Sequence, residues 1–204
     1  MLLEVEQKFV VALSNLTKFR VNRGTPPFKS LKFSKNITFE DVYYDHNNIL
    51  SGLGIWIRKR DNQWEAKRRI SGDYLRSTFD ETGNPDQIHG MLKDLIPYRV
   101  LKSPERNFGL DVLARFRTTR ETYIANEKYT IVLDSTDFGH MVGEIEVMGE
   151  DETKAHQEID NFRQQHSWFF ESGNPEGKLS AYFRKFGRQQ LFGERRSNGD
   201  QGVI

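Results

Sequence analysis

Several segments of this chain alternate between charged and strongly apolar side chains, and the segment nearest the N-terminus shows the pattern most clearly. There Glu4, Glu6 and Lys8 fall on one face, whereas Val5 and Phe9 fall on the other. A period of two residues is typical of a β-strand, because successive side chains of a strand point to opposite faces of the sheet. A sheet built from such strands has one apolar face that must be covered and one charged face.

The same alternation, interrupted by turn residues, predicts a chain made mainly of strands. We expect strands over residues 2–10, 38–44, 54–60, 63–70, 74–80, 97–101, 112–124, 128–134 and 142–147. Tight turns are expected at Asp61-Asn62 and at Asn126-Glu127. Helices are predicted over residues 12–21, 85–95, 152–170 and 175–191, and residues 23–36 are expected to form a loop or an edge strand.

About eight strands joined mostly by short turns, with helices near the middle and the end, favour an α+β fold. We predict an antiparallel eight-stranded β-barrel, closed or nearly closed, with flanking helices outside. No internal repeat or low-complexity linker divides the sequence. We therefore expect one domain over residues 1–192 and a polar C-terminal tail over residues 193–204.

The composition limits the classes of function. With 30 Lys+Arg against 29 Asp+Glu, the chain has no overall attraction to nucleic acid or to an anionic membrane. The absence of cysteine excludes disulfides, thiolate zinc sites and a cysteine nucleophile. No stretch approaches the ~18 apolar residues of a membrane span, and the first residues carry charges where a signal peptide has an apolar run. We therefore expect a cytoplasmic protein without nucleic-acid or membrane partners.

The charged faces of the expected strands have two interpretations. They comprise Glu4, Glu6 and Lys8; Arg58 and Arg60 with Trp56; Glu65, Lys67 and Arg69; and Glu144 and Glu146. Such faces are common on the solvent side of antiparallel sheets. In a barrel covered by helices, however, the apolar face packs outwards and the charged face lines the lumen. The strongly apolar opposite faces and the separation of acids from arginines favour the lumen.

A lumen lined in this way has groups for binding both a metal and phosphates. Carboxylate oxygens suit Mg²⁺ or Mn²⁺, which keep several waters and bridge to substrate phosphates. Arginine and lysine bind phosphate oxygens. A water bound to the metal or oriented by a carboxylate can then attack a terminal phosphorus. The residues alone thus indicate a site that can bind a divalent metal on one wall and a phosphate-bearing anion on the other, and that can direct a water to phosphorus.

Several motifs follow one another in an order that resembles a known superfamily. They are Glu4-Val5-Glu6-Gln7-Lys8, Tyr43-Tyr44-Asp45, residues 56–60, residues 64–67, residues 116–120 with Tyr123, Leu133-Asp134, residues 137–139, Gly143-Glu144-Ile145-Glu146, and residues 177–179 with Tyr182. Together they span about residues 2–187 and resemble the CYTH superfamily, the triphosphate tunnel metalloenzymes. The nearest resemblance is to its thiamine-triphosphatase branch, which implies a Mg²⁺-dependent, cytosolic and monomeric hydrolase that converts thiamine triphosphate to thiamine diphosphate and phosphate.

The resemblance also implies a role for individual residues. The catalytic residues would be Glu4, Glu6, Lys8 and Lys67. The substrate would be bound by Lys8, Trp56, Arg58, Arg60, Lys67, Asp80, Arg120 and Lys178. The metal, Mg²⁺ or Mn²⁺, would be held by Glu4, Glu6, Asp134, Glu144 and Glu146.

Two features bear on the substrate and on the metal. By alternation Trp56 faces the same way as Arg58 and Arg60. Its indole can therefore stack on a cationic thiazolium ring of a substrate. Packing inside the barrel explains a tryptophan at this position as well. The family's central acid falls at Asp80 or Glu81, of which we favour Asp80. This chain also departs from the family pattern at Thr118, where a second base is usual, and at Val132, where the branch has another acid.

Other functions fit the same sequence. Within the barrel these are an inorganic tripolyphosphatase, a nucleoside triphosphatase and an adenylate cyclase, which share the metal and phosphate residues. A catalytically silent polyphosphate-binding module is disfavoured by the paired acids, because an anion binder gains nothing from clustered carboxylates. A structural β-domain is the remaining alternative.

Overall fold

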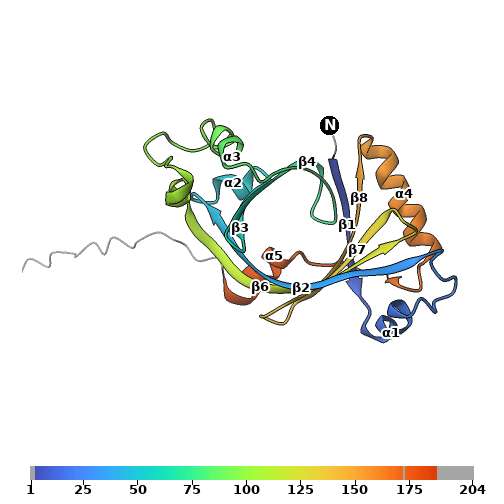
Figure 1. Cartoon of the computed structure of the whole chain (residues 1–204). Helices are drawn as coiled ribbons and strands as arrows, with labels where there is room; N and C mark the ends of the chain where they lie inside the picture. The colour runs from blue at the N-terminus through green and yellow to red at the C-terminus, as the bar shows by residue number, and fades with distance from the viewer. Residues whose placement is uncertain (1–2, 172, 188–204) are drawn as a thin grey trace, which may run out of the picture.

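The computed structural model describes residues 3–171 and 173–187, and their dominant feature is a ring of antiparallel strands (Figure 1). The strands are β1 (Leu3–Val11), β2 (Leu31–Asp45), β3 (Ile55–Arg60), β4 (Gln63–Gly72), β5 (Arg76–Thr82), β6 (Asp111–Ala125), β7 (Tyr129–Thr136), β8 (Met141–Gly149) and the short β9 (Phe170–Glu171). The helices are α1 (Leu16–Arg20), α2 (Ile49–Gly52), α3 (Pro85–Leu92), α4 (Glu152–Gln165) and α5 (Lys178–Phe186), with short 3₁₀ turns at Leu13–Asn15 and Pro104–Gly109.

The strands are hydrogen-bonded in the order β5-β4-β3-β2-β6-β7-β8-β1-β9, and β1 also pairs with β5. This last pairing joins β5 to β1, so that β1 to β8 form the expected eight-stranded ring, and the short β9 extends from β1. The β1–β5 pairing aligns Glu4 with Phe79 and Glu6 with Ser77. On its other edge β1 pairs with β8 and aligns Glu6 with Glu146. The acidic first and last strands of the sequence are therefore neighbours.

The apolar faces of the strands point outwards and are covered by helices, as the alternation predicts. On one side α4 packs Ala155, Ile159 and Phe162 against a core that includes Val5 and Ile145. On the opposite side α3 packs Ile88 and Leu92 against a core that includes Ile55, Ile57 and Val42. Figure 1 shows α4 and α3 on opposite sides of the ring. The burial of these apolar faces leaves the charged faces for the interior.

Helix α5 differs from the other helices because it packs on the inner face of the sheet. Its Ala181 lies in a buried cluster with Tyr43 and Phe116, and Tyr43 lines the central cavity. The expectation that all helices lie outside is therefore wrong for α5. This position brings Lys178, the first residue of α5, to the interior of the ring.

The element boundaries confirm most of the sequence predictions and correct some. Asp61-Asn62 and Asn126-Glu127 form turns with positive φ angles, as tight turns between antiparallel strands require. Residues 97–101 form no strand; Val100 and Leu101 instead pack against the core beneath α3. Strand β2 begins earlier than expected, α4 ends earlier, and α5 begins at Lys178. Residues 188–191 of the last expected helix and the tail over 193–204 lie outside the described residues.

One close contact sets the distance between β1 and β8. Gly143 of β8 lies opposite Phe9 of β1, and a Cβ atom at Gly143 would stand 2.2 Å from Cζ of Phe9. Phe9 is fully buried and makes edge-on contacts with Phe169 and Phe170. The ring of Phe9 therefore cannot move aside easily.

We expect Gly143→Ala to lower the free energy of unfolding by about 1–3 kcal/mol, because the added methyl group overpacks the Phe9 site. Urea denaturation measures this change. The matched control is Gly90→Ala in α3, where a Cβ atom would meet nothing within 4 Å; it should stabilise the protein by about 0.5–1 kcal/mol. Equal effects of the two substitutions would contradict this account of the β1–β8 contact.

Candidate active site

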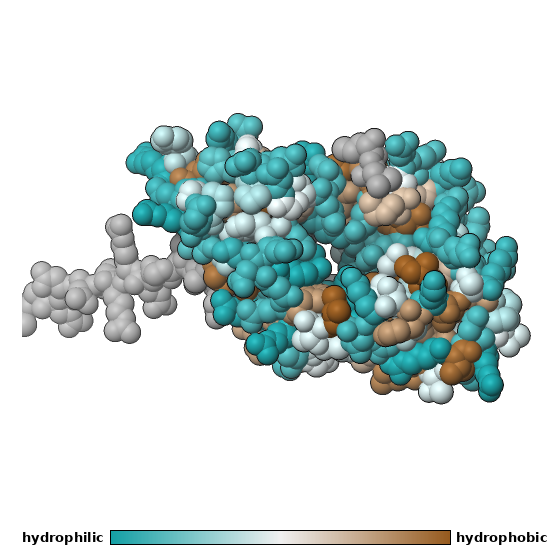
Figure 2. Space-filling model, in the orientation of Figure 1, coloured by the Kyte–Doolittle hydropathy of each residue, from teal (hydrophilic) through white to brown (hydrophobic). Residues whose placement is uncertain are grey.

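A cavity of about 510 Å³ lies inside the ring. Among the residues that line it are Glu4, Glu6, Lys8, Trp56, Arg58, Arg60, Lys67, Arg120, Glu144, Glu146 and Lys178. In the view of Figure 2, hydrophilic residues dominate the surface, and a hollow lies between the side that carries α3 and the side that carries α4. The alternating charged faces thus converge on one interior space and are not spread over the solvent side of the sheet.

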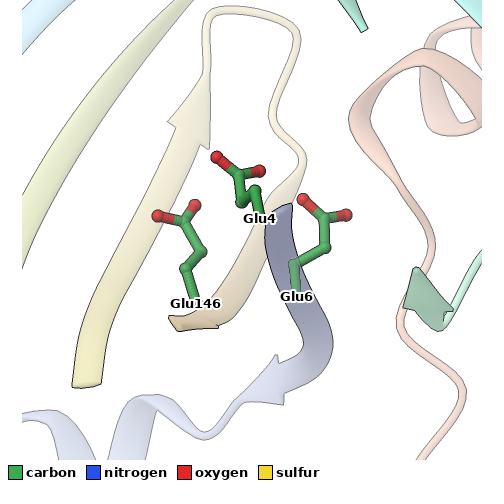
Figure 3. A group of neighbouring side chains, drawn as sticks. All are labelled: Glu4, Glu6 and Glu146. Carbon is green, nitrogen blue, oxygen red and sulfur yellow. The ribbon is translucent and has the colours of Figure 1, made fainter. Parts of the chain in front are cut away.

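Three acids from adjacent strands form the most compact group in this cavity. One carboxylate oxygen from each of Glu4, Glu6 and Glu146 lies within 4.8 Å of the other two. Figure 3 shows the three side chains projecting from β1 and β8 to the same side. Three oxygen donors at this spacing suit a hard divalent cation such as Mg²⁺, which is usually bound by a few carboxylates and retains waters. The donor set therefore fits the metal that the sequence predicts.

Lys67 places an ammonium group against the same acids. Its Nζ lies 2.5 Å from Glu4 Oε1 and 3.0 Å from Glu6 Oε2, and 2.9 Å from Glu81 Oε1. Burial by itself lowers the pKa of Lys67, but the surrounding carboxylates, Glu6 foremost, raise it well above its usual value. Lys67 is therefore a cation at neutral pH and neutralises part of the acidic group.

Two acids that are two residues apart on β8 have opposite shifts in pKa. Burial, with repulsion from Glu4 and Glu144 and against the attraction of Arg120, raises the pKa of Glu146 to about 8. Burial also acts to raise the pKa of Glu144, but Lys8, with other cations, outweighs it and holds that pKa well below its ordinary value. The two pKa values therefore differ because burial outweighs the attraction of the cations at Glu146, whereas the cations outweigh burial at Glu144.

The arginines of β3 form the opposite wall and are held in place by acids. The fully buried Asp41 of β2 accepts from Arg60 Nε at 2.8 Å and from Arg60 Nη2 at 2.9 Å. Arg58 donates to Glu65 at 2.6 Å and to the hydroxyl of Tyr43 at 3.1 Å. Both guanidinium groups are therefore already held in position at the cavity. An anion that binds there loses no affinity to the ordering of these side chains.

A second pair of bases is anchored by Asp134. Arg120 donates from Nε and Nη2 to its two carboxylate oxygens, both at 2.7 Å, and Lys178 also donates to Asp134. Burial acts to raise the pKa of Asp134, but the charges of Lys178 and Arg120 lower it below its ordinary value. Asp134 therefore remains an anion that holds two cations at the cavity wall.

The structure brings only part of the expected metal set together among the described residues. Asp134 does not line the cavity, and both of its oxygens accept hydrogen bonds from Arg120 and Lys178. Glu144 does line the cavity, but it lies 3.5 Å from Lys8 and 3.5 Å from Arg120. Only Glu4, Glu6 and Glu146 of the five predicted ligands come together, among the residues that the structure describes.

The structure brings Glu81 to the cavity and does not bring Asp80 there. Asp80 points to the outside of β5, where it accepts from Arg68 at 2.8 Å. Glu81, the next residue, lies opposite Lys67 across the β4–β5 pairing and lines the cavity. A register shift between Arg69 and Ser71 of β4 changes the alignment of β4 with β5. The alternation in β4 therefore does not predict which acid of β5 faces the cavity.

Asp41 is the residue of the site that the sequence analysis did not single out. The alternation places Asp41 on the same face as Tyr43, two residues later, so the signal was present, but no family motif includes Asp41. The alternation in the sequence did place Glu65 and Arg69 on the face of Lys67, which lines the cavity. Neither of them was assigned a role in catalysis or binding.

Comparisons with known proteins agree with this geometry. A family model described as the CYTH domain matches residues 2–174. Human thiamine-triphosphatase is 27% identical over 170 residues, which cover 75% of this chain and 71% of the human protein. Among solved structures, a protein of Pyrococcus horikoshii OT3 is similar with a TM-score of 0.58 at 20% identity, covering 89% of this chain and 99% of its own.

A second similar structure is a Hippeastrum protein described as a candidate adenylyl cyclase with a dominant triphosphatase activity. It has a TM-score of 0.52 at 19% identity and covers 89% of this chain and 95% of its own.

Within the described part of the chain, no helix has the length and apolar character needed to cross a bilayer. The family match extends over most of the sequence and over every strand of the ring, so the chain belongs to the CYTH domain family.

Proposed function

We propose that this protein is a metal-dependent hydrolase that cleaves the terminal phosphate of a small triphosphate-bearing molecule, with thiamine triphosphate as the first candidate substrate. The observation that carries the proposal is the cavity in which an acidic group on β1 and β8 faces anchored bases on β3, β6 and α5. Its relatives include the human thiamine-triphosphatase and a Hippeastrum protein with triphosphatase activity.

The acids Glu4, Glu6 and Glu146 would hold the metal, Mg²⁺ or alternatively Mn²⁺. A divalent cation there supplies Lewis acidity and neutralises charge on the phosphates. The acids have a further part of their own. Glu4 and Glu6 line the cavity, and carboxylate oxygens at such a position can accept hydrogen bonds from a water and orient it towards phosphorus.

The bases would bind the phosphate oxygens. Lys8, Arg58, Arg60, Lys67, Arg120 and Lys178 all line the cavity, and each is paired with a protein carboxylate. Fixed positive groups stabilise the charge on the oxygens of a transferring phosphoryl group without reorganising during the reaction. Lys8 and Lys67 contact the acids as well as the cavity, so they link the acidic group to the phosphate-binding wall.

Trp56 supports the thiamine assignment, and its neighbour supports an alternative. Trp56 lines the cavity beside Arg58 and Arg60, as the alternation predicts, where an indole can stack on a thiazolium ring. The guanidinium of Arg69, however, lies 4.9 Å from the centre of the Trp56 ring. This observation favours inorganic tripolyphosphate as a second candidate, because tripolyphosphate carries no cationic group.

Replacing Glu146 with glutamine should weaken Mn²⁺ binding at least about tenfold, because a neutral amide is a poorer ligand for a hard cation than a carboxylate. Isothermal titration calorimetry measures this affinity in the absence of substrate. The matched control is Glu158→Gln, which changes an acid of α4 that pairs with Lys128 on the surface. Unchanged Mn²⁺ affinity in the Glu146 variant would contradict the metal assignment.

With Mg²⁺, the purified protein should release phosphate from thiamine triphosphate or tripolyphosphate, and Glu6→Gln should lower kcat/KM by about 10²-fold or more. A colorimetric phosphate assay on both substrates and on ATP gives the comparison. Preference for thiamine triphosphate supports the first candidate, and preference for tripolyphosphate supports the second. Absence of phosphate release from all three substrates would overturn the proposed function.

A further inference from the structure

Arg69 differs from every other cation that lines the cavity. The other cavity cations form ion pairs with protein carboxylates: Lys8, Arg58, Arg60, Lys67, Arg120 and Lys178. Over residues 3–171 and 173–187, no carboxylate lies at ion-pair distance from Arg69. Its Nε atom is buried and has no hydrogen-bond acceptor among these residues. Arg69 therefore brings to the cavity a positive charge that no carboxylate of these residues contacts directly, and only the more distant Asp73 attracts it.

An aromatic ring holds Arg69 in place of an acid. Its guanidinium carbon lies 4.9 Å from the centre of the Trp56 ring, and Trp56 in turn meets Phe79 edge-on at 5.8 Å between ring centres. A guanidinium over an indole face is a favourable cation–π arrangement. A ligand that reaches the Trp56 ring therefore meets a ring that already contacts the guanidinium of Arg69.

Two consequences follow for a ligand whose triphosphate lies on Arg58 and Arg60. A cationic group brought to Trp56 is repelled by Arg69 and competes with it for the ring, because arginine keeps its charge at any working pH. An anionic group at the same place gains an ion pair and an acceptor for the buried Nε hydrogen. Arg69 therefore distinguishes triphosphates by the charge of the group behind the phosphates.

We propose that Arg69 is a specificity residue that, over the face of Trp56, favours an anionic group linked to the triphosphate and disfavours a cationic one such as a thiazolium. The proposal rests on the proposed function in so far as triphosphates bind in this cavity. Arg69 then favours inorganic polyphosphates most and thiamine triphosphate least. Nucleoside triphosphates, whose base is uncharged, lie between the two.

The test compares two neighbouring arginines on opposite faces of β4. Arg69→Met removes the charge in the cavity, whereas Arg68→Met removes the same charge from the outer face, where Arg68 pairs with Asp80. Calorimetric dissociation constants for tetrapolyphosphate, which carries a further anionic phosphate behind its triphosphate, and for thiamine triphosphate are measured in EDTA for the wild type and both variants. We expect Arg69→Met to shift the ratio of the two constants towards thiamine triphosphate on the order of tenfold, and Arg68→Met to leave it unchanged.

Each outcome separates this proposal from the proposed function. A ratio that stays constant in Arg69→Met, or that shifts equally in Arg68→Met, overturns the role of Arg69 and leaves the hydrolase assignment intact. Binding in EDTA with the expected shift, but no phosphate release in the assay with Mg²⁺, supports Arg69 and overturns the hydrolase. A wild type that binds neither compound overturns both. Arg69→Lys keeps the charge and serves as the folding check, because its ratio should stay closer to that of the wild type than the ratio of Arg69→Met.

Discussion

The pairing of β1 with β5 is the interaction on which the rest of the site depends. It joins the first and last of the eight long strands in the hydrogen-bonding order, so that the sheet closes on itself and its charged face becomes an interior. With β8 on its other edge, β1 is hydrogen-bonded on both sides. Glu4 and Glu6 are thereby fixed between Glu146 of β8 and Lys67 of β4. In an open sheet the same residues would face solvent, and their charges would be screened.

An interior that carries so many charges requires that most of them be paired, because a buried ion without a partner is strongly unfavourable. The structure meets this requirement with two kinds of acid. Asp41 and Asp134 lie fully buried behind the wall and anchor arginines, whereas Glu4 and Glu6 lie at the cavity and pair with lysines. The first kind keeps the bases in position. The second kind is available to a cation that arrives with a substrate.

The sequence predicts most of this arrangement because alternation determines which side chains share a face. It does not show which carboxylates anchor bases and which remain for a metal, since that depends on contacts between elements far apart in the sequence, as for Asp134 of β7 with Lys178 of α5. The position of Asp80 outside the cavity has a local cause, because the register shift in β4 decides which acid of β5 faces Lys67. The domain boundary at residue 192, the monomeric state and the cytoplasmic location stay predictions.

The claim that the interior of the ring is the reaction site is tested most directly by diffraction from crystals grown with Mn²⁺ and tripolyphosphate. The anomalous signal of manganese locates the metal independently of any structural model. This account predicts a manganese peak inside the ring, bound by Glu4, Glu6 and Glu146, with phosphate oxygens on Arg58 and Arg60. A manganese peak at Asp134, or metal and phosphate bound only on the outer surface, would contradict it.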